Sequence, residues 1–116
     1  LAQMTAESLA FPDSVFDYVV ATFVFCSVSD PVAGLREVAR VCKPQGTILL
    51  LEHTRIERPI IGSLMDMANP LAVRLTGANI NRRTVGNLRL AGLSISSVED
   101  LAPMGLVKLI TAHPTI

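Results

Sequence analysis

The stretch FDYVVATFVF at residues 16–25 decides the fold class, because it is a continuous run of β-branched and aromatic residues. Such a run is typical of a strand that is buried on both faces of a sheet. A second apolar run, TILLLEH at residues 47–53, ends abruptly in polar residues. Residues 31–42 lie between the two runs and carry apolar side chains at helical spacing. A strand, a helix and a strand with short connections predict a parallel βαβ unit.

The ends of the central helix are marked by residues with known capping roles. The Asp30 side chain can accept a hydrogen bond from a backbone N–H group of the first helical turn. Pro31 fits the first helical position, because the N–H group that proline lacks would have no partner within the helix there. After residue 42, the segment Lys43–Gly46 contains a cation, a proline and a glycine, which together predict the end of the helix.

The remainder of the chain predicts further helices and a hairpin. Residues 56–77 keep a looser helical spacing, and Asn69-Pro70 is expected to kink or split that element. Asn81 can cap a helix over residues 82–91, which Gly92 ends. Strands near residues 93–100 and 106–113 are too close in sequence for a parallel crossover, so we expect them to pair antiparallel. No linker divides the chain, and residues 1–116 predict a single domain.

Composition excludes several classes of protein. The chain has 116 residues, of which 50% are hydrophobic, and ten basic residues balance ten acidic ones. No basic surface for nucleic acid is expected, and no apolar run approaches the length of a membrane span. Cys26 and Cys42 lie in apolar stretches, where reduced core thiols are expected, and this favours a cytoplasmic protein. The two histidines and two cysteines show no close pair of metal ligands, so no metal site is predicted.

Three segments together resemble the class I S-adenosylmethionine-dependent methyltransferases, in particular those acting on small molecules, quinone precursors and lipids. These are Ala6–Asp13, Phe16–Val20 and Leu35–Gly46, which are similar to the segment after the family's third strand, its fourth strand, and the helix and turn before its fifth. The resemblance implies an α/β fold: a partial Rossmann-like sheet with strands in the family order 4-5-7-6, the last two antiparallel, and helices on both faces.

Two features of a complete member have no counterpart here. The family carries a glycine-rich turn after its first strand and an acidic residue after its second, which hold the cofactor. No two glycines of this chain are separated by a single residue. The chain therefore resembles the C-terminal half of such an enzyme, truncated relative to a complete member, and tight binding of S-adenosylmethionine by this chain alone is not expected.

The resemblance implies which residues would face the cofactor. Thr5 stands where the family has an acidic residue near the adenine, and Ala6 matches the residue that follows. Phe25, Cys26 and Ser27 correspond to the end of the fourth strand, which faces the methionine part of the cofactor and the acceptor. These five residues are the predicted, vestigial cofactor contacts.

Glu52 and His53 are the candidate catalytic residues. They leave the second predicted strand at the edge where parallel sheets bind ligands, and a histidine beside a carboxylate can deprotonate a hydroxyl or a thiol. The alternative is a pair that only binds loop backbone. In the same way, residues 60–75, with Met65 and Met67, are either a lid over a lipophilic acceptor or an ordinary packed helix.

Two classes of function remain open. The chain is either the C-terminal portion of a methyltransferase for a small or lipophilic acceptor, inactive in isolation, or a non-catalytic dimeric module that binds a small ligand or a partner. In a complete family member the fourth strand is central, so residues 18–25 are expected to form an open apolar edge here. We expect a homodimer through that edge.

Overall fold

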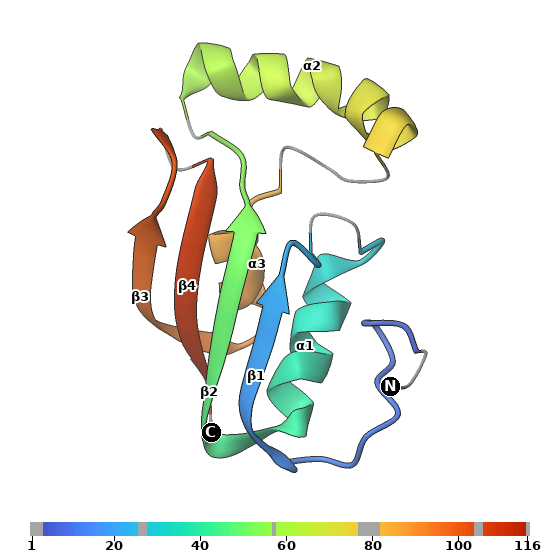
Figure 1. Ribbon diagram of the computed structural model, residues 1–116, viewed down its shortest axis with the longest axis vertical. Helices are drawn as coiled ribbons and strands as arrows, with labels where there is room; N and C mark the ends of the chain where they lie inside the picture. The colour runs from blue at the N-terminus through green and yellow to red at the C-terminus, as the bar shows by residue number, and fades with distance from the viewer. Residues whose placement is uncertain (1–3, 26–27, 57, 77–81, 104–105, 116) are drawn as a thin grey trace.

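The structure is a computed structural model that describes residues 4–25, 28–56, 58–76, 82–103 and 106–115. Four strands form one sheet in the order β1-β2-β4-β3 (Figure 1), namely β1 (Phe16–Thr22), β2 (Cys42–His53), β3 (Leu93–Asp100) and β4 (Val107–Pro114). β1 and β2 are parallel, whereas β4 is antiparallel to both β2 and β3. This confirms the predicted βαβ unit, the C-terminal hairpin and the strand order expected from the resemblance.

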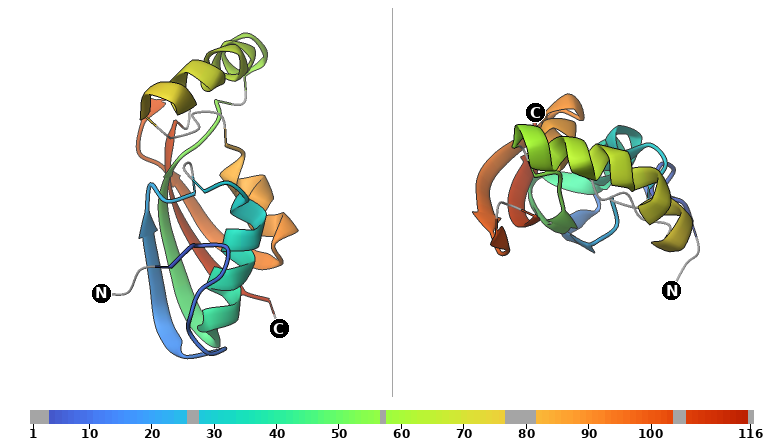
Figure 2. Two further views of the ribbon diagram at one scale, coloured as in Figure 1. Left: turned by 90° about the vertical axis from the view of Figure 1, so that its right-hand side faces the viewer. Right: turned by 90° about the horizontal axis from the view of Figure 1, so that it is seen from above.

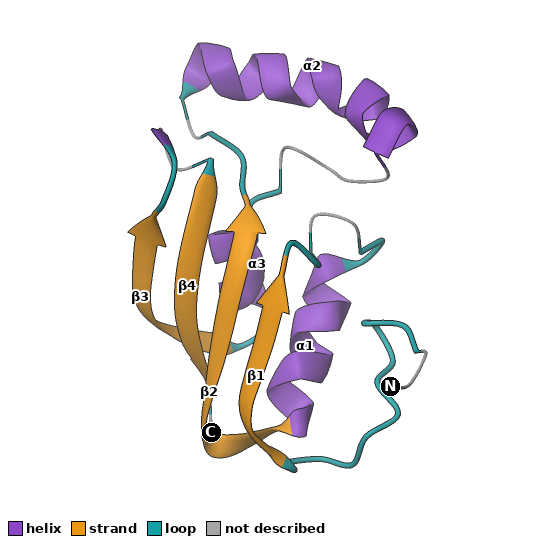
Figure 3. Ribbon diagram, in the orientation of Figure 1, coloured by secondary structure: helices purple, strands orange, loops and turns teal. Residues whose placement is uncertain are grey.

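Two helices cover one face of the sheet. α1 (Pro31–Val41) and α3 (Thr84–Leu90) pack against each other and against the sheet, and Figure 2 shows both on the same side. α2 (Pro59–Thr76) instead crosses beyond the carboxyl ends of β1 and β2 (Figure 3). The expectation of helices on both faces was wrong for the described part of the chain, because α2 leaves the sheet instead of folding back over it.

The core lies between the sheet and the helical pair. In β2 the side chains of Ile48, Leu50 and Glu52 have no exposed surface, and the intervening residues face the other side of the sheet. This alternation with a period of two means that only one face of β2 is fully buried. α1 contributes Leu35 and Val38 to the same core. Burying these side chains together is what fixes α1 and the strand ends relative to one another.

The first strand departs from its prediction in two ways. It ends at Thr22 instead of Phe25, because Phe23 adopts a φ of 54° and turns the chain out of the strand. It is also not buried on both faces: Tyr18 is 69% exposed and Val20 is 68% exposed. The described helices cover only the opposite face, so no described helix covers these two side chains.

Helix boundaries were predicted more closely. Asp30 caps α1 as expected, since its side chain accepts a hydrogen bond of 3.0 Å from the Ala33 amide. α2 runs through Pro70 without a break, so the expected split does not occur. α3 begins at Thr84, and the expected cap Asn81 lies outside the described residues.

Within the described residues no helix combines the length and the apolar character needed to cross a membrane.

The segment Lys43–Gly46 belongs to β2 in the structure instead of forming a separate turn. The strand begins at Cys42 because that residue already has extended dihedral angles, and an irregularity in the register absorbs the extra residues beside β1.

Cys42 is a free, buried thiol, as predicted, and burial raises its pKa. Cys26 lies outside the described residues.

Candidate active site

The candidate site lies where β1 and β2 end side by side. The arrowheads of both strands point toward α2, and the segments leading to α1 and α2 begin there (Figure 3). The Phe23 amide still donates to the Leu51 carbonyl at 2.7 Å, which holds the two strand ends together. Ligands of open α/β sheets bind at the carboxyl ends of parallel strands. A ligand site formed by the predicted residues would therefore lie at this edge.

Glu52 is a completely buried carboxyl group that binds the loop after β1. Its Oε1 atom accepts a hydrogen bond of 3.0 Å from the Phe25 amide. Its Oε2 atom has no hydrogen-bond partner among the described residues. Burial raises the pKa of Glu52, and hydrogen bonds from the Phe25 and Val24 amides oppose that shift. Glu52 thus shapes the backbone at the strand end instead of lying open to a ligand.

Lys108 is the nearest cation by register, yet it does not neutralise Glu52. The two residues are directly opposite each other in the β2–β4 pair, so their side chains share a face. The Lys108 Nζ atom instead lies 2.6 Å from Asp100 Oδ1 on β3. Burial is the largest influence on the Glu52 pKa, and Lys108 is not among the groups that shift it.

His53 lies on the other face from Glu52, because successive residues of a strand point in opposite directions. Its side chain is exposed, and its ring stacks on Phe23 with ring centroids 4.6 Å apart. The structure therefore separates the two members of the predicted pair. Only His53 is accessible to an acceptor, and Phe23 is the residue that orients it.

Phe25 is a core residue at this position, with only 2% of its surface exposed. Its ring packs on α1 at Gly34, where an added Cβ atom would approach the ring to 2.9 Å. Only the Phe25 backbone is therefore available at the strand end. Cys26 and Ser27, predicted with it, lie outside the described residues.

Thr5 and Ala6 belong to the N-terminal segment beside α1. Thr5 pairs with Ser8 in an isolated bridge, and Glu7 Oε1 accepts a hydrogen bond of 3.3 Å from the Asp30 amide. That bond brings the segment to the beginning of α1, which follows the loop after β1. The structure thus places the predicted adenine contacts on the same side of the molecule as the Phe25 loop.

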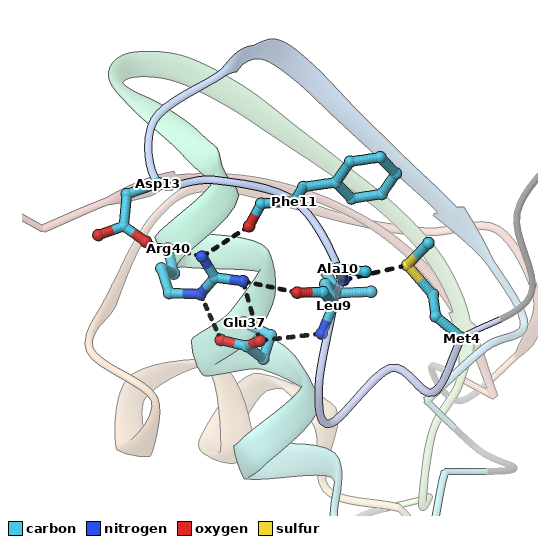
Figure 4. Close-up of polar contacts among 7 residues, drawn as sticks. All are labelled: Met4, Leu9, Ala10, Phe11, Asp13, Glu37 and Arg40. Atoms are coloured by element: carbon cyan, nitrogen blue, oxygen red, sulfur yellow. Dashed lines mark hydrogen bonds and ion pairs between the residues drawn. The ribbon is translucent and has the colours of Figure 1, made fainter.

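Sequence reasoning missed the two residues that hold this segment, which are Glu37 and Arg40 of α1. The Leu9 amide donates to Glu37 Oε1 at 2.9 Å, while Arg40 donates to the Leu9 and Phe11 carbonyls (Figure 4). Arg40 also pairs with Glu37 at 2.6 Å and with Asp13 at 2.7 Å. The signal was present: an acid and an arginine three residues apart on the polar side of a helix.

His113, the second histidine of the chain, lies outside the candidate site. His113 Nδ1 lies 3.0 Å from the Gly46 carbonyl, near the beginning of β2 and away from the candidate site. Among the described residues, no three His, Cys, Asp or Glu side chains come together in a way that could hold a metal ion.

Comparisons with known proteins agree with this fold. Residues 1–50 match the protein family described as "Methyltransferase domain". A ubiquinone/menaquinone biosynthesis C-methyltransferase of Hahella chejuensis is 38% identical over 76 residues, which are 66% of this chain and 30% of that protein. The matched part of the chain therefore spans less than a third of this curated relative.

Solved structures give the same assignment of fold. A putative methyltransferase of Bacillus halodurans matches with a TM-score of 0.77 at 16% identity, over 99% of this chain and 78% of that one. The [4+2]-cyclase SpnF matches with a TM-score of 0.76 at 22% identity, over 99% of this chain and 55% of that one. With the β1-β2-β4-β3 sheet, these structures show that the chain has the fold of the class I methyltransferases, and the sequence matches show that it is similar to S-adenosylmethionine-dependent members of that family.

Proposed function

We propose that this chain, as one domain over residues 1–116, is the C-terminal, acceptor-facing portion of a methyltransferase for a small or lipophilic molecule. The observation that carries the proposal is the junction of β1 and β2, where Glu52 holds the backbone of the Phe25 loop. The segment with Thr5 and Ala6 is tied to the beginning of α1 next to this loop. Together they form one wall of a site at the edge where such folds bind ligands.

The fit of the cofactor to this wall is partial. The backbone beside Phe25 and the segment with Thr5 and Ala6 would contact S-adenosylmethionine, which when bound supplies an electrophilic methyl group. The glycine-rich turn and the ribose carboxylate of the family have no counterpart in this sequence. We therefore expect this chain alone to bind the cofactor no better than weakly and to be inactive in isolation.

His53 is the group proposed to accept a proton from the methyl acceptor. It is exposed at the end of β2, and its contact with the Phe23 ring limits its orientations. An imidazole can accept a proton from a hydroxyl or a thiol near neutral pH. Glu52 is a positioning residue in this proposal, because it binds the Phe25 backbone and has no exposed surface.

A lipophilic acceptor is supported by the surface of α2. Exposed apolar side chains recur along one side of this helix at Ile60, Leu64, Met67, Leu71 and Leu75. Met65, by contrast, is fixed beside the strand end, because its sulfur atom accepts a hydrogen bond from the Ile56 amide at 3.3 Å. The helix lies across the carboxyl ends of β1 and β2 (Figure 1), and Gly62 and Met65 face those ends. The exposed apolar side chains lie on the opposite side of α2, so they would contact a lipophilic molecule on the outer surface of the helix.

The second candidate is a non-catalytic module that forms a homodimer and binds a small ligand or a partner. The open edge of β1, with Tyr18 and Val20 exposed, favours it. A related fold does not imply methyl transfer, since one structural neighbour is described as a [4+2]-cyclase. For both candidates we propose a cytoplasmic location, because Cys42 is a free thiol in the core.

Calorimetric titration with S-adenosylmethionine tests the proposal on two samples: this chain, and the natural gene product purified from its source and weighed by mass spectrometry. We expect weak binding to this chain and binding in the low micromolar range, roughly −8 kcal/mol, to a product that carries the glycine-rich turn. A natural product of only these residues that does not bind the cofactor would establish the non-catalytic candidate. Low micromolar binding to this chain alone would contradict the expected inactivity.

A further inference from the structure

A cavity of about 290 Å³ beside the end of β2 is lined by four cationic side chains. Arg55 comes from the segment after β2, Arg82 and Arg83 from the segment before α3, and Lys108 from β4. The buried hydroxyl residues Thr54 and Thr84 lie between them. No acidic residue is among the described residues that line this cavity. In a chain whose formal net charge is zero, this is a local concentration of positive charge.

Two of these cations are held in place by carboxylates outside the cavity. Arg55 Nη2 lies 2.9 Å from Asp66 Oδ2 of α2, and the Arg55 side chain is only 11% exposed. Its guanidinium group lies against Gly62, where an added Cβ atom would approach it to 2.5 Å. Lys108 is similarly bound to Asp100. These contacts fix the positions of the two cations in the wall.

Arg82 has no carboxylate partner among the described residues. Its Nη2 atom donates to the Val28 carbonyl at 2.8 Å, and its carbonyl accepts a hydrogen bond from the Arg55 amide at 2.7 Å. The Nε atom is buried and has no hydrogen-bond partner in the described part of the chain. This Nε atom has no surface open to the cavity. Arg82 as a residue lines the cavity, and it brings there a positive charge that has no carboxylate partner among the described residues.

We propose that this cavity binds the oxyanion group, a carboxylate or a phosphate, of the molecule that the enzyme methylates; this inference rests on the proposed methyltransferase function and specifies its acceptor class as anionic. Arginine donors arranged around a small cavity match the planar or tetrahedral oxygens of such groups. The cavity is next to the end of β2, on the face of the sheet that Lys108 shares with Glu52, and His53 at the same strand end points to the other face. Through the ion pair of Arg55 with Asp66 the cavity is also linked to the side of α2 that faces the strand ends.

Titration of the full chain followed by NMR amide shifts tests the proposal without S-adenosylmethionine. The probes are phenyl phosphate, inorganic phosphate and phenol, which separate an organic anion from a free anion and from an uncharged ring. We expect phenyl phosphate to bind several-fold more tightly than inorganic phosphate and to shift the amide signals of residues 82–86. We expect no binding of phenol. Equal binding of inorganic phosphate would indicate a free-phosphate site and overturn the assignment to an acceptor, and equal binding of phenol would overturn the anion site.

Three variants test whether phenyl phosphate binds in this cavity. Arg82→Gln removes the guanidinium group and should weaken phenyl phosphate binding about tenfold, the usual loss for one hydrogen bond to a charged group. Because Arg82 also holds Val28, the second variant is Gly86→Glu, which adds a carboxylate where a Cβ atom meets nothing within 4 Å. Arg89→Gln is the matched control, since Arg89 is an exposed arginine of α3, the helix that contains Gly86, and it does not line the cavity.

The control should bind phenyl phosphate as the unmodified chain does. An equal loss in Arg89→Gln, or unchanged binding in both Arg82→Gln and Gly86→Glu, would overturn the site. Since no cofactor is present in this titration, loss of anion binding leaves the methyltransferase proposal standing. Conversely, failure of the natural product to bind S-adenosylmethionine leaves a measured anion site intact.

Discussion

At the scale of single residues, Glu52 is expected to make the fold less stable as the pH rises, because it is a buried carboxyl group. Burial raises its pKa above the ordinary value of 4.5. A carboxyl group whose pKa is higher in the folded state takes up a proton on folding. Its contribution is therefore most favourable below pH 4.5 and declines as the pH rises through the raised pKa.

Substitution of Glu52 separates this charge effect from its hydrogen bonds. Glu52→Gln keeps an oxygen for the Phe25 amide and cannot ionise, so stability should decline less between pH 4.5 and pH 8 than in the unmodified chain. Glu52→Ala leaves buried amides without an acceptor and should cost about 1–3 kcal/mol. Urea unfolding across this pH range checks both. An unchanged pH profile in Glu52→Gln would show that Glu52 does not titrate there.

Gly34 and Gly86 form a matched pair of helical glycines with opposite surroundings. An added Cβ atom at Gly34 would lie 2.9 Å from the Phe25 ring, whereas one at Gly86 would meet nothing within 4 Å. Gly34→Ala should lower the free energy of unfolding by about 1 kcal/mol, because overpacking outweighs the gain in helix propensity. Gly86→Ala should raise it by up to about 1 kcal/mol. Urea unfolding of both variants, side by side, measures the difference in sign.

At the scale of elements, the N-terminal segment is held to α1 by Glu37 and Arg40. Arg40→Met should free this segment, and hydrogen exchange of the peptide covering residues 5–13 should accelerate while that of β2 stays unchanged. Arg36→Met is the control, because Arg36 is exposed on the same helix. Accelerated exchange in the control to the same extent would mean that any loss of charge on α1 has this effect.

The same contact should depend on pH with a predictable sign. The hydrogen bond from Arg40, followed by the one from the Leu9 amide, lowers the pKa of Glu37 below its ordinary value of 4.5. A carboxyl group with a lowered pKa stabilises the fold above pH 4.5 and loses that contribution as the pH falls through the lowered value. Protection of residues 5–13 should therefore persist at pH 5 and disappear only in more acidic solution, as measured by hydrogen exchange corrected for intrinsic rates.

The elements that the sequence predicted well are those determined by local signals. Asp30 with Pro31 set the beginning of α1, and the apolar run at residues 47–53 predicted a strand, although it did not predict that only one face of β2 is fully buried. The end of β1 could not be predicted in this way, because it depends on a turn at Phe23 and on Glu52, which is 27 residues away from Phe25. The separation of Glu52 from His53 follows from strand alternation, yet which of the two is buried depends on where α1 and α3 pack.

At the scale of the whole molecule, the sheet has one covered and one uncovered face in the described chain. α1 and α3 share a single face, while Tyr18 and Val20 on β1 remain exposed. β1 is also an edge strand with no lysine or proline among its residues, so its outer backbone groups can accept another strand. An open apolar edge next to an uncovered apolar face favours association.

We expect the chain to form a homodimer in which the β1 strands of two copies pair antiparallel about a two-fold axis. The predicted edge of residues 18–25 narrows to residues 18–22, because the strand ends at Thr22. The Phe23 amide points toward β2, and amides alternate along a strand, so the Val20 amide points to the open edge. Val20→Pro therefore removes a donor from the edge without removing one from the β1–β2 pair, and it should yield a monomer in sedimentation equilibrium at tens of micromolar. Val20→Thr retains that N–H group and should remain dimeric. A monomeric unmodified chain, or a Val20→Pro variant that stays dimeric, would show that the edge of β1 is not the interface.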